Sequence, residues 1–81
     1  MDKFQDLGRI TRYHRKRAGL SQHALAKLAG VGKTAIFDLE KGKETIQLDT
    51  VRKILNALNI RMVFTGPLMK EYEQEGRDEK S

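Results

Sequence analysis

The 81-residue chain contains no cysteine and no tryptophan, a single proline, and few aromatic residues, at 6% of the sequence. Without cysteine it can form neither a disulfide framework nor a thiolate metal site, which fits a reducing compartment. No apolar run approaches the roughly 20 residues of a membrane span, and the N-terminus lacks the apolar stretch of a signal peptide. We therefore expect a soluble, cytoplasmic protein that has no membrane partner.

Acidic residues are also scarce in residues 1–66. Residues 1–66 contain thirteen basic and six acidic residues, a balance of +7, whereas residues 67–81 contain three and five, a balance of −2. Such a basic region suits a polyanionic partner, nucleic acid or an anionic lipid surface. The length allows one small core, so we expect one domain over residues 1–66 and a charged, flexible tail over residues 67–81.

Two short helices joined by a tight turn are predicted in the middle of the chain. Ser21 can cap a helix over residues 22–29, which places Leu25 and Leu28 on one apolar face. Gly30 can end this helix, because glycine enters the left-handed cap conformation without steric cost. A pair of helices of this length is typical of a DNA-binding helix-turn-helix.

The second of these helices is expected over residues 33–41, between Gly32 at its start and Gly42 at its end. Gly32 is a weaker N-terminal cap than serine, since it lacks a hydroxyl. The side chains expected to be buried are those of Ile36, Leu39 and part of Glu40.

The same residues carry a family resemblance, which extends from about residue 7 to residue 58. The matching residues are Gly19 to Gln22, Leu25-Ala26, Gly30-Val31, Ile36, Leu39-Glu40 and Gly42. In this register they resemble the lambda/Cro-repressor-like (XRE) helix-turn-helix family. The continuation over residues 45–64 is similar to HipB-type antitoxins of toxin–antitoxin operons, in which the last helix runs into a strand.

Two further helices are expected around the central pair. The first covers residues 4–18, and its inward side chains are expected to be Leu7, Thr11 and Ala18, with Ile10 close by. Its outer face carries Arg9, Arg12, Lys16 and Arg17, a cluster that either attracts DNA or is simply solvated. The last helix covers residues 49–58.

The last helix has a predicted start, stop and apolar face. Asp49 is a suitable N-terminal cap and Asn59 a suitable left-handed stop. Ile46 and Leu48, in the loop before it, are expected to enter the core. The helix itself should bury Val51, Ile54, Leu55 and Leu58.

After residue 59 the apolar residues follow a period of two, which is typical of a strand. Ile60, Met62 and Phe64 alternate with more polar positions, and Gly66-Pro67 ends the pattern. A lone strand cannot satisfy its backbone, so we expect it to pair with its own copy across a two-fold axis and to make a homodimer. The expected fold is thus all-α with one short C-terminal β-strand.

The start of a recognition helix points into the major groove, where side chains meet base edges. Lys33 and Thr34 occupy that position, and Asp38 follows one turn later; the family's base-reading residues fall at the same places. Lys33 can donate to guanine and Asp38 can accept from cytosine N4. The alternatives are a phosphate contact for Lys33 and a solvated or internally paired acid at Asp38. Phe37 contacts either a thymine or the seam between the two helices.

Phosphate contacts are expected from basic and amide side chains around the recognition helix, and these would dominate affinity. The basic residues concerned are Lys27, Lys41 and Lys43. Gln22 matches a glutamine of the family, and by that resemblance it should also reach a phosphate. By the resemblance, Arg15 and Glu40 match positions that form an ion pair between the first and third helices, and we expect them to be structural.

Two features resemble part of a catalytic or metal-binding motif, but neither motif is complete. The run from Gly30 to Thr34 imitates the end of a phosphate-binding loop, but Lys27 stands where that motif needs its first glycine. His14 and His23 have no cysteine or carboxylate at ligand spacing. We expect no metal, no cofactor and no enzymatic activity.

Three functions fit these observations. The first is a dimeric repressor that binds a palindromic operator of its own toxin–antitoxin operon and also binds a toxin, by the HipB resemblance a kinase (HipA-like). The second is a free-standing XRE-family regulator of phage or host genes. The third, an adaptor that has lost DNA binding, is disfavoured by Lys33, Thr34 and the basic balance. A bacterial, nucleoid-associated location follows from the first two.

Overall fold

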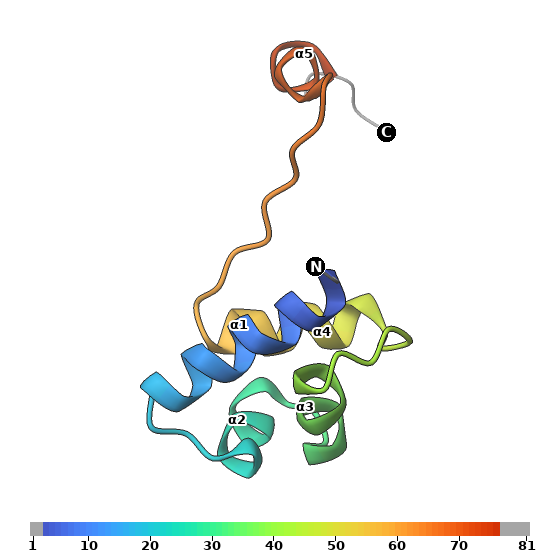
Figure 1. Ribbon diagram of the computed structural model, residues 1–81. Helices are drawn as coiled ribbons and strands as arrows, with labels where there is room; N and C mark the ends of the chain where they lie inside the picture. Colours follow the sequence, from blue (N-terminus) through green and yellow to red (C-terminus); the bar gives the residue numbers. More distant parts are fainter. Residues whose placement is uncertain (1–2, 77–81) are drawn as a thin grey trace.

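A computed structural model describes residues 3–76 as helices joined by turns and one extended segment (Figure 1). The helices are α1 (Lys3–Arg17), α2 (Gln22–Ala29), α3 (Lys33–Glu40), α4 (Leu48–Ala57) and α5 (Met69–Gln74). Figure 1 shows α1 to α4 packed together, whereas the chain after α4 leads away from them and ends in α5. We call residues 3–60 the body and residues 61–76 the arm.

The core of the body is formed by apolar side chains of α2, α3 and α4. Its buried members are Leu25, Ala26, Ile36, Leu39, Val51, Ile54 and Leu55. Leu7 of α1 and Ile60 after α4 are half-buried and pack against this cluster. Full burial of one such side chain stabilises the fold by about 1.5–3 kcal/mol. Leu58 packs on the cluster only half-buried.

The inner face of α1 is only partly the one predicted. Thr11 is fully buried, and its hydroxyl donates to the carbonyl oxygen of Leu7 at 2.8 Å, so the buried oxygen has a partner. Ala18 and Ile10, in contrast, are exposed. Ala18 lies outside the core because α1 ends one residue earlier and the chain turns through Gly19, whose φ is +74°.

α1 approaches α3 closely at Gly8, a residue that the sequence did not single out. A Cβ atom there would lie 2.5 Å from the carbonyl oxygen of Leu39 and 2.7 Å from that of Glu40. Both are backbone atoms, which cannot rotate away as the end of a side chain can. Glycine therefore permits the distance at which these two helices pack.

The caps of α2 confirm the predicted helix-turn-helix boundaries. Ser21 Oγ accepts a hydrogen bond from the amide of Ala24 at 3.0 Å, and Gly30 ends α2 with a φ of +76°. The burial of Leu28 was predicted wrongly, because this side chain is 62% exposed. The buried stripe of α2 runs along Leu25, Ala26 and the half-buried Ala29, and position 28 lies outside that arc of the helix.

The start of α4 also differs from the prediction. α4 begins at Leu48 after Gln47, and Leu48 is 69% exposed, whereas Ile46 packs against the core as expected. Asp49 therefore lies inside the first turn and does not cap the helix. The end is confirmed, since Asn59 adopts a φ of +60°.

Asp49 instead takes part in ion pairs along the surface of α4. Its carboxylate accepts a hydrogen bond from Arg52 Nη2 at 2.7 Å and lies 3.3 Å from Lys53 Nζ. The hydrogen bond from Arg52 is the main cause that lowers the pKa of the Asp49 carboxyl, and Lys53 lowers this pKa further. The carboxylate also lies near the positive N-terminal end of the α4 dipole.

The arm corrects the prediction of a C-terminal strand. No strand is present anywhere in residues 3–76, and Ile60, Met62 and Phe64 are not part of a ladder. Residues 61–65 are extended but make no hydrogen bonds in the described structure, because no second strand lies within reach of them. The predicted pairing of two such strands across a homodimer is therefore not supported by the structure of residues 3–76.

The arm also changes the dimensions of the molecule. The radius of gyration is 15.0 Å, against about 12 Å for a compact domain of this length. The predicted flexible tail over residues 67–81 begins with a helix, α5. Residues 1 and 2 of the predicted domain and residues 77–81 of the tail lie outside the described residues.

Candidate DNA interface

The turn between α2 and α3 places the start of α3 at the surface. Leu25 and Ala26 of α2 pack with Ile36 and Leu39 of α3, which fixes the angle between the two helices. Gly32 precedes α3 without a side-chain hydrogen bond to the helix end. The first exposed side chains of α3 are therefore carried by a packed helix pair and not by a loop.

Lys33 and Thr34 form this exposed first turn. Both residues are exposed, and among the described residues neither side chain has a hydrogen bond or ion pair. A free ammonium group can donate to guanine O6 or N7, and a threonine can offer a hydroxyl or a methyl group to a base edge. The position and the chemistry that the sequence predicts for base reading thus occur together.

Asp38 lies one turn further along α3 and is half-buried. Its Oδ2 is 3.5 Å from Lys43 Nζ, so the internally paired state considered from the sequence is the one present in the free protein. A pair this long at the surface contributes little stability. Lys43 is therefore shared between an acid of its own chain and any phosphate that approaches.

Phe37 lies at the surface of α3 and not inside the seam between α2 and α3. It is 47% exposed, and Lys41 Nζ stands 5.1 Å from the centroid of its ring. This cation–π contact joins a predicted base reader in α3 to a predicted phosphate contact at the residue that follows α3. An apolar ring with a cation beside it can meet a thymine methyl and the adjacent phosphate together.

An ion pair joins α1 to α3 behind this surface. Arg15 donates from Nε to Glu40 Oε2 at 2.6 Å and from Nη2 to Oε1 at 3.0 Å. Their side chains are only 9% and 3% exposed. The Glu40 hydrogen bond raises the pKa of the Arg15 guanidinium, which stays charged throughout. A third guanidinium donor bonds to the carbonyl oxygen of Leu20 at 2.9 Å.

Gln22 extends this pair in a way that the sequence did not suggest. Its Nε2 donates to Glu40 Oε1 at 3.2 Å, so the first residue of α2 is tied to the last residue of α3. The residue predicted to contact phosphate is thus held in place by the α1–α3 ion pair. An amide held in this way loses less side-chain freedom when it meets a ligand.

The other predicted phosphate contacts are exposed lysines at the edges of the helix pair. Lys27 lies in the last turn of α2, Lys41 follows α3, and Lys43 lies in the loop beyond. All three are exposed, as a contact with a DNA backbone requires.

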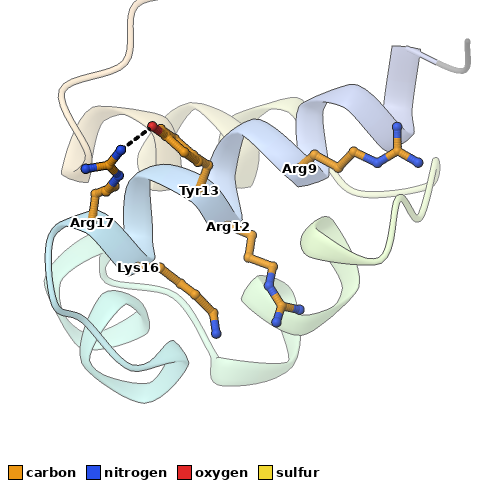
Figure 2. A pocket seen from close by; sticks show the side chains of 5 residues that line it. All are labelled: Arg9, Arg12, Tyr13, Lys16 and Arg17. Atoms are coloured by element: carbon orange, nitrogen blue, oxygen red, sulfur yellow. Dashed lines mark hydrogen bonds between the residues drawn. The ribbon is translucent and has the colours of Figure 1, made fainter.

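α1 carries a second basic surface, drawn in Figure 2. A shallow groove on its outer side is lined by Arg9, Arg12, Tyr13, Lys16 and Arg17. We call this the α1 groove. Arg17 Nη2 donates to the Tyr13 hydroxyl at 2.8 Å, and the dashed line in Figure 2 marks this bond.

The comparisons with known proteins agree with this geometry. A family model described as "Helix-turn-helix" matches residues 12–64, which is most of the body and the start of the arm. The chain belongs to the XRE-type helix-turn-helix family. It is an XRE-family DNA-binding transcriptional regulator by that membership. The matched region includes all of α2, α3 and α4 and ends before α5.

A relative is similar over most of both chains. It is an uncharacterized HTH-type transcriptional regulator, y4mF, of Sinorhizobium fredii (strain NBRC 101917 / NGR234). The two are 40% identical over 62 residues, which cover 76% of this chain and 82% of the relative. The resemblance to the XRE family is therefore confirmed, whereas a nearer relation to HipB-type antitoxins is not shown.

The described residues hold no cluster of three metal-ligating side chains. His14 Nδ1 lies 2.7 Å from the carbonyl oxygen of Ile10, a bond within α1, and His23 is exposed on α2. No helix within residues 3–76 is both long enough and apolar enough to span a membrane.

Proposed function

We propose that this regulator is a homodimeric repressor of its own operon and the antitoxin of a toxin–antitoxin pair, and that it acts by binding, without catalysis. The main support for the proposal is the exposure of apolar side chains on the arm. Val63 and Phe64 are more than 70% exposed on a segment that the body does not need for its core. Apolar side chains exposed together mark a surface that another protein covers.

For DNA, we propose that two copies place their α3 helices in successive major grooves of a palindromic operator, about 34 Å apart or at a multiple of that spacing. Lys33 and Thr34 read base edges, with Phe37 and Asp38 beside them. Gln22, Lys27, Lys41 and Lys43 contact phosphates on either side. The exposure of the first turn of α3 supports this assignment.

For the dimer, we propose that the arms of two copies lie along each other. The free backbone groups of residues 61–65 are available for a ladder, and Met62 and Phe64 can be covered on one face of it. Ile60 anchors the start of the arm on the core. The nucleoid is the expected location of such a dimer.

Operator binding is tested by replacing Lys33 and Thr34 together with alanine. We expect a loss of about 1–3 kcal/mol for each base contact removed, seen only with the specific site, because non-specific binding rests on phosphate contacts. Competition binding with operator DNA and with random DNA measures the specific and the non-specific affinity separately. Equal losses on the two DNAs would disprove base reading by these residues.

Lys43→Ala is the matched phosphate variant. We expect affinity to fall on every sequence alike, and the slope of log affinity against log salt to flatten by about one unit. An unchanged slope would assign Lys43 to its pair with Asp38 alone.

The antitoxin role is tested with the gene next to this one in its operon. We expect its induction to arrest growth and co-expression of the full chain to restore growth. The Lys33→Ala/Thr34→Ala variant should restore it equally, because neutralisation needs protein contact and not operator binding. A chain that ends at Ile60 should fail.

A harmless neighbouring gene, or rescue that is lost with Lys33 and Thr34, would refute the antitoxin role. The function would then be that of a free-standing regulator, which also fits the Sinorhizobium relative, an uncharacterized HTH-type transcriptional regulator. A kinase is the first toxin to consider, by the resemblance to HipB-type antitoxins.

A further inference from the structure

Two features of the molecule are not used by the DNA-binding surface, the α1 groove and the helix α5. The groove is basic, and α5 lies beyond the region that the family model matches, so the family assigns it no role. Figure 1 shows α5 at the far end of the arm, separate from the helices of the body. Each feature presents charged side chains that have no ion pair with any of residues 3–76.

The α1 groove offers positive charge beside an aromatic ring. Arg12 and Lys16 are exposed, and no ion pair or hydrogen bond engages either side chain in the described structure. Figure 2 shows them on one side of α1 and Tyr13 with Arg17 on the other, so the groove lies between two rows. A fitting ligand therefore carries negative charge toward Arg12 and Lys16 and an aromatic or apolar group toward the Tyr13 ring.

α5 has one face with this composition. Leu68, Glu71, Tyr72 and Glu75 follow the spacing i, i+3, i+4 and i+7, which places them on the same side of a helix. The helical path includes the outer two, because the amide of Tyr72 bonds to the oxygen of Leu68 and that of Glu75 to the oxygen of Glu71. All four are exposed.

The neighbouring face of α5 turns toward the arm. Met69, Tyr72 and Glu73 line a hollow together with Met62 and Phe64, so the Tyr72 ring borders both this hollow and the face that carries the two carboxylates. The face that carries Glu71 and Glu75 is left for another surface. Neither carboxylate has an ion pair within residues 3–76.

The charges of the two surfaces have the same spacing. Arg12 and Lys16 are four residues apart on α1, and Glu71 and Glu75 are four residues apart on α5. Side chains at this spacing lie about 6 Å apart along a helix, so two ion pairs can form side by side. Tyr72 can then pack on the Tyr13 ring and the aliphatic parts of the arginines.

The arm decides which copy supplies the groove. Residues 61–65 are extended, at about 3.3 Å per residue, and lead away from both α1 and α4 in Figure 1. An arm that stays extended cannot return α5 to the groove of its own chain. The groove within its reach belongs to a second copy.

We propose that the homodimer is closed by exchange of arms, in which α5 of each copy binds the α1 groove of the other. This rests on the proposed homodimer and adds its second contact, beyond the paired arms. It also covers Leu68 and Tyr72, which pairing of residues 61–65 would leave exposed. Since both contacts involve ion pairs, dimerisation should weaken as salt concentration rises.

The test uses the full chain and sedimentation equilibrium without DNA. We expect the double variant Glu71→Lys/Glu75→Lys to raise the dimer dissociation constant by about tenfold or more, and the double variant Arg12→Glu/Lys16→Glu to do the same. The reason is that each variant turns two ion pairs into like-charge pairs at both of the symmetric contacts. The control, Glu44→Lys/Asp49→Lys, makes the same charge change at exposed positions of the body that lie outside the arm and the α1 groove, and it should leave the constant unchanged.

Mixing the two reversed variants identifies the copy. If exchange occurs, each variant presents what the other needs, so a 1:1 mixture should form heterodimers at close to wild-type affinity. Restoration only when all four changes are in one chain would place α5 on its own groove and overturn the exchange.

Two further outcomes separate the proposals. A monomeric wild-type chain would refute the homodimer itself. A wild-type dimer that ignores both reversals would refute the exchange alone. If Arg12→Glu/Lys16→Glu left the dimer intact and lowered the salt slope of DNA binding, the groove would be a phosphate surface.

Discussion

The body and the arm contain similar kinds of apolar residues, but the body buries them and the arm exposes them. In the body, Leu25, Ile36 and Ile54 are fully buried, whereas in the arm Val63 and Phe64 are more than 70% exposed. The body's apolar residues recur at helical spacing, so its helices cover one another within one chain. The apolar residues of the arm recur at a spacing of two, which is typical of a strand, but residues 3–76 contain no strand with which the arm could pair.

The comparison teaches that hydrophobic pattern predicts local structure well and burial less well. A helix with an apolar face can be covered by its neighbours in sequence through short turns. An isolated extended segment depends on a second molecule, and its structure in the free chain differs from that expected in an assembly. Variants in the two regions should therefore have effects of different size and kind.

The largest effect on the body is expected from Glu40→Ala. This variant leaves the Arg15 guanidinium buried without its carboxylate and removes the acceptor of Gln22, at a cost of about 3–5 kcal/mol in the free energy of unfolding. Urea denaturation measures it. Asp49→Ala, which breaks exposed pairs only, is the control and should lose much less. Equal losses would mean that the buried pair is not structural.

The direct comparison of the two regions uses one apolar truncation in each. Ile36→Ala should lower the free energy of unfolding by about 2–5 kcal/mol, because it leaves a cavity in the core. Phe64→Ala should leave it unchanged at concentrations where the chain is monomeric. A destabilised Phe64 variant under those conditions would show that the arm packs on the body of its own chain.

A smaller effect is expected from the pair Gly8→Ala and Gly66→Ala. Alanine normally stabilises a helix interior, but at Gly8 its Cβ meets the backbone of α3, so we expect a loss of about 1–3 kcal/mol. Gly66 has open space around it, and its substitution should change thermal unfolding little. A more stable Gly8 variant would show that α1 and α3 can separate without cost.

The smallest of these effects concerns the caps of the two central helices. Ser21→Ala removes the hydroxyl that accepts from Ala24 and should cost about 1 kcal/mol. Gly32→Ala, at a cap with no side-chain hydrogen bond, removes no such bond and should cost less than Ser21→Ala. Thermal unfolding of both variants checks the order. The reverse order would mean that the hydroxyl bond at Ser21 contributes nothing.

Much of the fold could be predicted because its signals are local. The limits of α2 follow from Ser21 and Gly30, and the end of α4 from Asn59, since each of these residues meets a requirement of its own backbone. The exposed start of α3 follows from the same boundaries. These signals need no knowledge of what lies across the core.

Other features could not be predicted because they depend on neighbours distant in sequence. Leu28 and Leu48 look like core residues in a linear pattern, yet the arc of each helix that meets another helix leaves them outside. The contact of Gln22 with Glu40 depends on how far the end of α3 lies from the start of α2.

The sequence by itself determined the helix-turn-helix, because caps, helical spacing and glycine stops act within a few residues of each other. It did not determine the structure after residue 59, because the strand that it predicts there is absent from residues 3–76. Only the tertiary structure decided that Gly8 sets the distance between α1 and α3, that Gln22 joins the Arg15–Glu40 pair, and that the arm stands free of the body. The physical reason is that these features are distances between segments, which arise from packing and not from the preference of any residue for its own conformation.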